Sequence, residues 1–100
     1  MFDLKKAMEL KKQMEAMTGK LDAILVDGES GQAPYTVKVT VTANRDIKDI
    51  SISPDLMAPG NAAQVEDLVL SALNKAIDKA KELAETEARA MALGGKFPGL

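Results

Sequence analysis

The stretch that decides the fold runs from Gly28 to Leu56 and reads GESGQAPYTVKVTVTANRDIKDISISPDL. Its centre alternates apolar with polar side chains: Tyr35, Val37, Val39 and Val41 against Thr36, Lys38, Thr40 and Thr42. A period of two is typical of a β-strand with one buried face and one polar face. The sequence therefore predicts a strand over residues 35–43. We interpret its threonine face as solvent-exposed or as bordering a dimer interface.

Two further strands are predicted on either side of this one. Residues 22–28 form the first, and residues 47–53 form the third, which Pro54 ends after the short turn Asn44-Arg45-Asp46. Between the first two strands, DGESG resembles the start of a calcium-binding loop but lacks its distal glutamate. Its Asp, Gly and Ser residues favour a hairpin turn instead. Short connections favour an antiparallel meander.

Each end of the chain is predicted to be a long helix. In residues 2–20, apolar side chains recur at spacings of three and four: Ala7, Leu10, Met14, Met17 and then Leu21. The second helix spans residues 62–93, with Asn61 as its N-cap and Gln64 as the partner in a capping box. We predict one α+β domain over residues 1–93, in the order α-β-β-β-α with two long helices and a three-stranded antiparallel sheet. A flexible Gly/Pro tail is expected at residues 94–100.

The composition excludes several function classes. The chain has 100 residues, 46% of them hydrophobic, with no histidine and no cysteine. It therefore has no imidazole base, no thiol nucleophile and no Cys/His metal site. A carboxylate pair would need a concave pocket, for which so small a domain has little room. We expect no enzyme, no cofactor, no metal and no small-molecule substrate.

The same features bear on location. No apolar run approaches the length of a membrane span, and the N-terminus lacks the apolar segment of a signal peptide. The absence of cysteine is compatible with a reducing compartment. We expect a cytoplasmic protein without a membrane partner.

The second helix has more apolar surface than one sheet requires. About thirty residues of helix span about 45 Å, whereas strands of six to nine residues reach about 20–30 Å. The overhanging half is still apolar, and its candidate packing residues are Ile77, Ala80, Leu83, Ala84 and Met91. A second copy of the chain would cover this surface in a homodimer. The alternative is that the first helix of the same chain covers it.

Charge is unevenly distributed. The net charge of the chain is −2, but five lysines against Asp3, Glu9 and Glu15 leave +2 over residues 1–20. If Ala7 and Met14 occupy the first position of a heptad, two paired copies of this helix would oppose lysine with lysine. Its apolar seam is therefore expected to meet the second helix or the sheet.

These lysines are the candidate contacts for an anionic partner. Lys5 and Lys12 are predicted to lie opposite the seam and to point into solvent, and Lys6, Lys11 and Lys20 are further candidates. The alternative is an ordinary solvated helix face, in which Lys5 pairs with Glu9.

Two segments resemble a known family. GESGQAPYTVKVTVTANRDIKDISISPDLM (28–57) and EDLVLSALNKAIDKAKE (66–82) are similar to the YbaB/EbfC family of bacterial nucleoid-associated proteins. The second segment shares the EDL opening and an alternating pattern carried here by Ala72, Asn74 and Ala76. The similarity covers nearly the whole chain in the right order. It implies a tweezer-like homodimer that binds double-stranded DNA in the nucleoid.

The residues and the resemblance together predict the function. We expect duplex DNA binding dominated by phosphate contacts, with weak sequence preference and a gene-regulatory or nucleoid-organising role. The alternative is a small dimeric protein–protein interaction module. It would use the acidic face of the second helix, which carries Asp78, Glu82 and Glu85.

Overall fold

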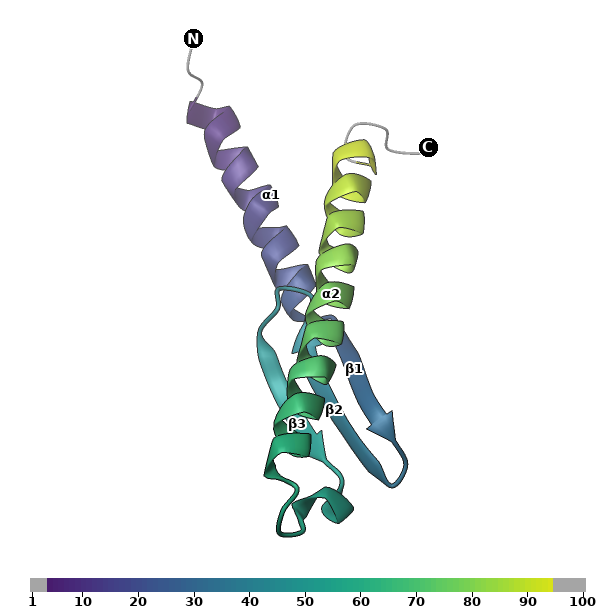
Figure 1. The fold of residues 1–100 in the computed structure, drawn as a ribbon. Helices are drawn as coiled ribbons and strands as arrows, with labels where there is room; N and C mark the ends of the chain where they lie inside the picture. The colour runs from purple at the N-terminus through teal and green to yellow at the C-terminus, as the bar shows by residue number, and fades with distance from the viewer. Residues whose placement is uncertain (1–3, 95–100) are drawn as a thin grey trace.

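A computed structural model describes residues 4–94 of the chain (Figure 1). The elements are α1 (Leu4–Asp22), β1 (Leu25–Gln32), β2 (Tyr35–Thr42), β3 (Ile47–Ile52), the short 3₁₀ helix η1 (Pro54–Met57) and α2 (Ala62–Gly94). The strands form one antiparallel sheet in the order β1-β2-β3. This confirms the predicted α+β fold and its α-β-β-β-α order. Most of the tail predicted at residues 94–100 lies outside the described residues, as do residues 1–3.

The alternation in β2 separates the two faces of the sheet. Val37, Val39 and Val41 have no exposed surface, and they pack against Ala72, Ala76 and Ala80 of α2, with Leu56 completing the buried cluster. The three alanines recur every four residues and therefore lie along one line of the helix. Small side chains at these positions let α2 approach the sheet closely.

Gly28 of β1 lies where the helix comes nearest to the sheet. It pairs with Val39 and is buried. A Cβ atom on Gly28 would overlap the backbone carbonyl oxygen of Ala72 and the backbone nitrogen of Ala76. Because both obstacles are backbone atoms, no rotation of a side chain can make room. The packing of α2 on β1 therefore requires glycine here.

The position of Gly28 corrects two interpretations made from the sequence. The segment DGESG is not a hairpin turn, because Asp27 to Gly31 all belong to β1, and the turn to β2 comes after Gln32. The first strand was predicted over residues 22–28, whereas α1 continues to Asp22 and β1 begins at Leu25. Turn-forming residues suggested a loop because the contact that requires glycine involves α2, more than forty residues further along the chain.

The helix α2 covers the sheet unevenly. It packs on β1 and β2, and Lys75 and Lys79 donate hydrogen bonds to the backbone carbonyls of Glu29 (3.1 Å) and Asp27 (2.9 Å) on β1. The edge strand β3 is left with apolar side chains in the open. Ile50, which pairs with Val39 on the covered side of the sheet, is 45% exposed, and Ile47 is 51% exposed.

The long helices extend beyond the sheet, as expected. At 33 residues, α2 spans about 50 Å, and the chain is elongated, with principal extents of 65 × 27 × 18 Å. In Figure 1, α1 and the far half of α2 project from the same end of the sheet and diverge from one another. Neither helix within the described range combines the length and apolar character that a bilayer span requires.

Two glycine substitutions test the close contact. Gly28→Ala is expected to lower the free energy of unfolding by about 3 kcal/mol, because the new methyl group meets backbone that must shift. Gly19→Ala in α1 is the control. Its Cβ meets no atom within 4 Å, so better helix propensity should stabilise the protein by about 0.5–1 kcal/mol. Urea unfolding followed by circular dichroism at one protein concentration measures both changes. Equal effects of the two substitutions would contradict the close contact at Gly28.

Candidate nucleic-acid interface

The lysine-rich helix α1 projects from the sheet and is fixed at its C-terminal end (Figure 1). Leu21, in the last turn, is the buried residue of α1, whereas Met17 and Ala7 are half-buried. Most other side chains of the helix are exposed. An amphipathic helix usually hides its apolar side against its own sheet, so α1 is an arm rather than a covering layer.

The turn between β2 and β3 forms the anchor of this arm. The side-chain amide of Asn44 donates to the backbone carbonyl of Thr18 (3.1 Å) and to Oδ1 of Asp22 (2.6 Å). The backbone N–H of Ala43 approaches the carbonyl oxygens of Leu21 (3.2 Å) and Ile24 (3.0 Å). Carbonyl groups in the last turn of a helix lack partners within the helix. The turn supplies such partners and thereby sets the direction in which α1 leaves the sheet.

The structure brings most of the candidate lysines to one side of the arm. All five are exposed: Lys5, Lys6, Lys11, Lys12 and Lys20. At about 100° per residue, Lys5, Lys6, Lys12 and Lys20 fall within an arc of about 120°. Lys11 lies on another side, where it lines a shallow groove with Leu10 and Met14.

Lys20 forms an ion pair with the second helix. Its Nζ lies 2.7 Å from Oε2 of Glu87 on α2. The pair sits in a groove of about 390 Å³ between the two helices, which is lined by Gln13, Ala16, Met17, Lys20, Glu87, Ala90 and Met91. A phosphate would have to displace Glu87 before Lys20 could bind it.

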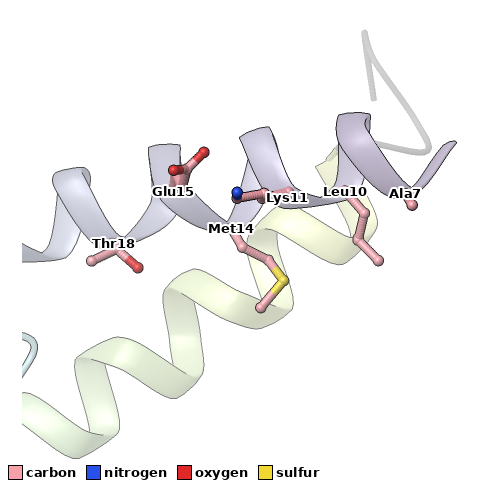
Figure 2. A pocket seen from close by; sticks show the side chains of 6 residues that line it. All are labelled: Ala7, Leu10, Lys11, Met14, Glu15 and Thr18. Atoms are coloured by element: carbon pink, nitrogen blue, oxygen red, sulfur yellow. The ribbon is translucent and has the colours of Figure 1, made fainter. Parts of the chain in front are cut away.

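The apolar seam of α1 does not pack as the sequence predicted. Figure 2 shows Ala7, Leu10 and Met14 pointing to the same side of α1, with Glu15 pointing away from them. Leu10 is 58% exposed and Met14 is 63% exposed. The expectation that the seam meets the second helix or the sheet is wrong for Leu10 and Met14, whereas Met17 lines the groove against α2 and Leu21 is buried. The rest of that groove is formed by the adjacent side of α1, around Gln13 and Lys20.

The candidate packing residues of α2 have different environments. Ala80 is fully buried against the sheet of its own chain, so it needs no second copy. Ile77, Leu83 and Ala84 are half-buried, and Met91 is 37% exposed in the groove facing α1. Ala80 is thus covered by the sheet, whereas the alternative interpretation had the first helix cover this face.

The threonine face of β2 is occupied by internal hydrogen bonds. Thr40 donates to Oδ1 of Asp27 (2.6 Å), and the hydroxyl groups of Thr36 and Ser53 lie 2.8 Å apart. Thr42 is buried, and its Oγ1 accepts hydrogen bonds from backbone N–H groups of the following turn. This face carries one lysine, Lys38, beside Asp27 and Glu29 of β1, and it offers little to an anion.

The acidic residues of α2 further restrict where an anion can bind. Asp78, Glu82 and Glu85 are exposed on the side of the helix that faces away from the sheet. Like charges repel an anion, so the lysine-bearing side of α1 is more favourable to an anionic partner than this face of α2. Within residues 4–94, no group of three or more acidic side chains is arranged to hold a metal ion.

The turn between β2 and β3 contributes more than its sequence predicts. Asn44 and Arg45 were predicted only as part of a short connection, whereas Asn44 anchors α1 and Arg45 adopts a left-handed backbone conformation. The available signal was the polar triplet Asn44-Arg45-Asp46 between two strands, because asparagine commonly bonds to nearby backbone groups. Its partner Thr18 lies in a distant part of the sequence.

Comparisons with known proteins identify the family of this chain. The YbaB/EbfC DNA-binding family matches residues 1–96. A nucleoid-associated protein of Nitrobacter hamburgensis is 41% identical over 98 residues, which cover 97% of this chain and 91% of the relative. One from Afipia carboxidovorans is 36% identical over 97 residues, covering 97% and 90%.

A solved structure shares the fold. An uncharacterized protein from Helicobacter pylori superposes with a TM-score of 0.69 at 22% identity, covering 92% of this chain and 99% of the other. The sequence matches place the protein in a bacterial class of nucleoid-associated DNA-binding proteins. The chain belongs to the YbaB/EbfC DNA-binding family, which confirms the resemblance seen in the sequence.

Substitutions at the anchor test how α1 is held. Asn44→Ala removes two hydrogen bonds and should lower the free energy of unfolding by about 1–2 kcal/mol. Asn44→Asp keeps the shape but offers only acceptors to the Thr18 carbonyl and Asp22, so it should cost more. Asp22→Asn in that background returns a donor and should recover part of the loss. Hydrogen exchange of α1 and urea unfolding report both effects. Wild-type behaviour of Asn44→Asp would contradict the anchor.

Proposed function

We propose that this protein is a homodimer that binds duplex DNA mainly through phosphates, with the lysines of α1 as its contacts. The observation that carries the proposal is the placement of exposed Lys5, Lys6 and Lys12 on one side of a projecting helix. The acidic face of α2 and the hydrogen-bonded threonine face of β2 leave no equally favourable surface in the described residues. Membership of a DNA-binding family supports DNA as the anion.

The chemistry of the arm favours phosphate over base recognition. Lysine ammonium groups act as point charges toward phosphate, and phosphate contacts carry no direct sequence information. The arm has no Arg, Asn or Gln side chain near its lysines except Gln13, which lies in the groove against α2. Such binding covers many sites on a chromosome with weak sequence preference. It suits a protein that organises the nucleoid and influences many genes there.

The dimer is supported by apolar surface that the single chain leaves open. β3 has a strand on one side only, and Ile50 and Ile47 lie uncovered on its α2 side. Lys75 and Lys79 of α2 face β1. Leu70 and Ile77, seven residues apart, lie on the opposite side of this helix from the two lysines. Leu70 and Ile77 therefore border β3. Leu70 is 59% exposed. A second copy would cover this surface, which adjoins the core and includes an open strand edge.

Salt-dependent binding tests the phosphate contacts. If about four to six phosphates are neutralised per dimer, the logarithm of affinity should fall with the logarithm of salt concentration at a slope of about −4 to −5. Fluorescence anisotropy of a labelled duplex of about thirty base pairs, roughly 100 Å long, measures this slope. Lys5→Glu/Lys12→Glu should lower affinity at least roughly tenfold while circular dichroism remains unchanged.

A matched variant separates local contact from net charge. Lys81→Glu/Arg89→Glu makes the same change in charge at two exposed positions of α2. Its effect on affinity should be clearly smaller than that of the α1 variant. Equal losses of affinity in the two variants would mean that DNA binding depends on the net charge of the protein and not on contacts made by α1. Absence of binding by the wild-type protein at low salt would overturn the proposal and favour a protein partner for the acidic face of α2.

Substitutions on β3 test the dimer. Ile50→Glu places a charge on the proposed interface and should yield a folded monomer of 10.6 kDa. Ser51→Glu is the control, because Ser51 is exposed on the opposite face of the same strand. It should leave the dimer intact. Light scattering coupled to size-exclusion chromatography gives the mass, and a dimeric Ile50→Glu protein would exclude this interface.

A further inference from the structure

The turn between β2 and β3 is held in a single conformation by its own hydrogen bonds. The backbone N–H of Arg45 donates to the carbonyl of Thr42 (2.8 Å), and the N–H of Thr42 donates to the carbonyl of Asp46 (2.8 Å). Oγ1 of Thr42 accepts from the N–H groups of Asn44 (3.1 Å) and Asp46 (3.2 Å). Together with the bonds from Asn44 to α1, these contacts leave the backbone of the turn little freedom.

Within this turn, Arg45 occupies a position that its residue type disfavours. Its φ angle is 70°, in the left-handed region that glycine and asparagine adopt readily and that costs other residues free energy. The backbone hydrogen bonds of the turn would be available to any residue with an N–H group. They therefore do not explain why a long cationic side chain occupies this place.

The side chain of Arg45 is free to act outside its own chain. Arg45 is exposed, and within residues 4–94 its guanidinium group makes neither a hydrogen bond nor an ion pair. The acidic neighbours are Asp46, which is exposed, and Asp22, whose Oδ1 already accepts a hydrogen bond from Asn44. A residue held in a disfavoured conformation with an unused charged group indicates a functional role.

The anchor places Arg45 at the base of the lysine-bearing arm. Asn44, the preceding residue, is bonded to the C-terminal turn of α1. Lys12 lies ten residues before Asp22, or about 15 Å along the helix axis. That distance corresponds to about four or five phosphates of one DNA strand. At about 100° per residue, Lys11 lies on the side of α1 that carries Thr18 and Asp22, and Lys12 lies about 100° further round the helix. A duplex lying against this side of α1 could meet Lys11, Lys12 and Arg45.

We propose that Arg45 is a further DNA-contact residue, which binds a phosphate of the duplex that α1 contacts, and that Asn44 positions it. The planar guanidinium group can bind two phosphate oxygens through two parallel N–H donors, whereas a lysine ammonium group acts as a point charge. The turn thereby extends the basic surface of the arm toward the sheet. This inference rests on the proposed DNA binding and adds a contact that the sequence did not reveal.

Arg45→Gly separates contact from structure, because glycine adopts a positive φ without cost. The variant should unfold at the same urea concentration as wild type or a higher one. Its affinity for the labelled duplex should fall roughly threefold to tenfold, and the salt slope should become shallower by about 2 per dimer, one for each lost contact. Arg45→Lys keeps the charge and should retain most of the slope. Lys38→Gln removes the same charge from the outer face of the sheet and should leave the slope unchanged.

The possible results separate the Arg45 contact from the proposed DNA binding through α1. Reduced affinity with undiminished stability in Arg45→Gly supports the contact. Wild-type affinity and slope in Arg45→Gly overturn the inference and leave DNA binding through α1 intact. Parallel loss of stability and affinity assigns Arg45 a structural role and also overturns it. If the wild-type protein fails to bind the duplex while remaining folded, the proposed function itself is wrong.

Discussion

The rest of the structure depends on the contact between α2 and the first two strands. Gly28 lets the helix backbone approach the sheet, and Ala72 and Ala76 present surfaces small enough to lie there. The valines of β2 are then fully buried although the chain has few aromatic residues. Close packing of small groups thus replaces the aromatic core that a domain of this size often has.

This contact also determines what remains uncovered. Because α2 lies over β1 and β2, it cannot cover β3, and isoleucines on the covered side of that strand remain open. The same placement sends the far half of α2 beyond the end of the sheet, where α1 runs beside it without close packing. The uneven cover of one helix therefore produces both an uncovered apolar edge and a projecting arm, the two features on which the proposed dimer and DNA binding rest.

The sequence predicted the parts of this architecture that depend on local periodicity. The alternation of Val37, Val39 and Val41 and the long apolar face of α2 were read correctly, because each pattern repeats within one element. Features that arise from contacts between distant segments were missed. Gly28 looks like a turn residue until α2 is placed above it, and Asn44 looks like a loop residue until Thr18 is placed beside it.

The candidate site shows the same division. Lysine clustering on α1 could be predicted from spacing, and the structure keeps four of the five lysines on one side. The pairing of Lys20 with Glu87 could not be predicted, since it depends on the angle between two helices. Leu10 and Met14 of the seam were expected to pack internally but are exposed, because helical spacing shows which residues share a face and not what covers that face.

Because α1 is held at its C-terminal end, a small rotation there moves its N-terminal end by a larger distance. Its 19 residues extend about 28 Å from a pivot formed by Asn44 and the last turn of the helix. A rotation of about ten degrees at this pivot moves the far end by about 5 Å, which exceeds the rise of a base pair. The position of the lysines is thus governed by the last turn of α1, by its hydrogen bonds and by the ion pair between Lys20 and Glu87. In the proposed DNA binding, such an arm would adapt to a duplex whose curvature and groove width change along a chromosome.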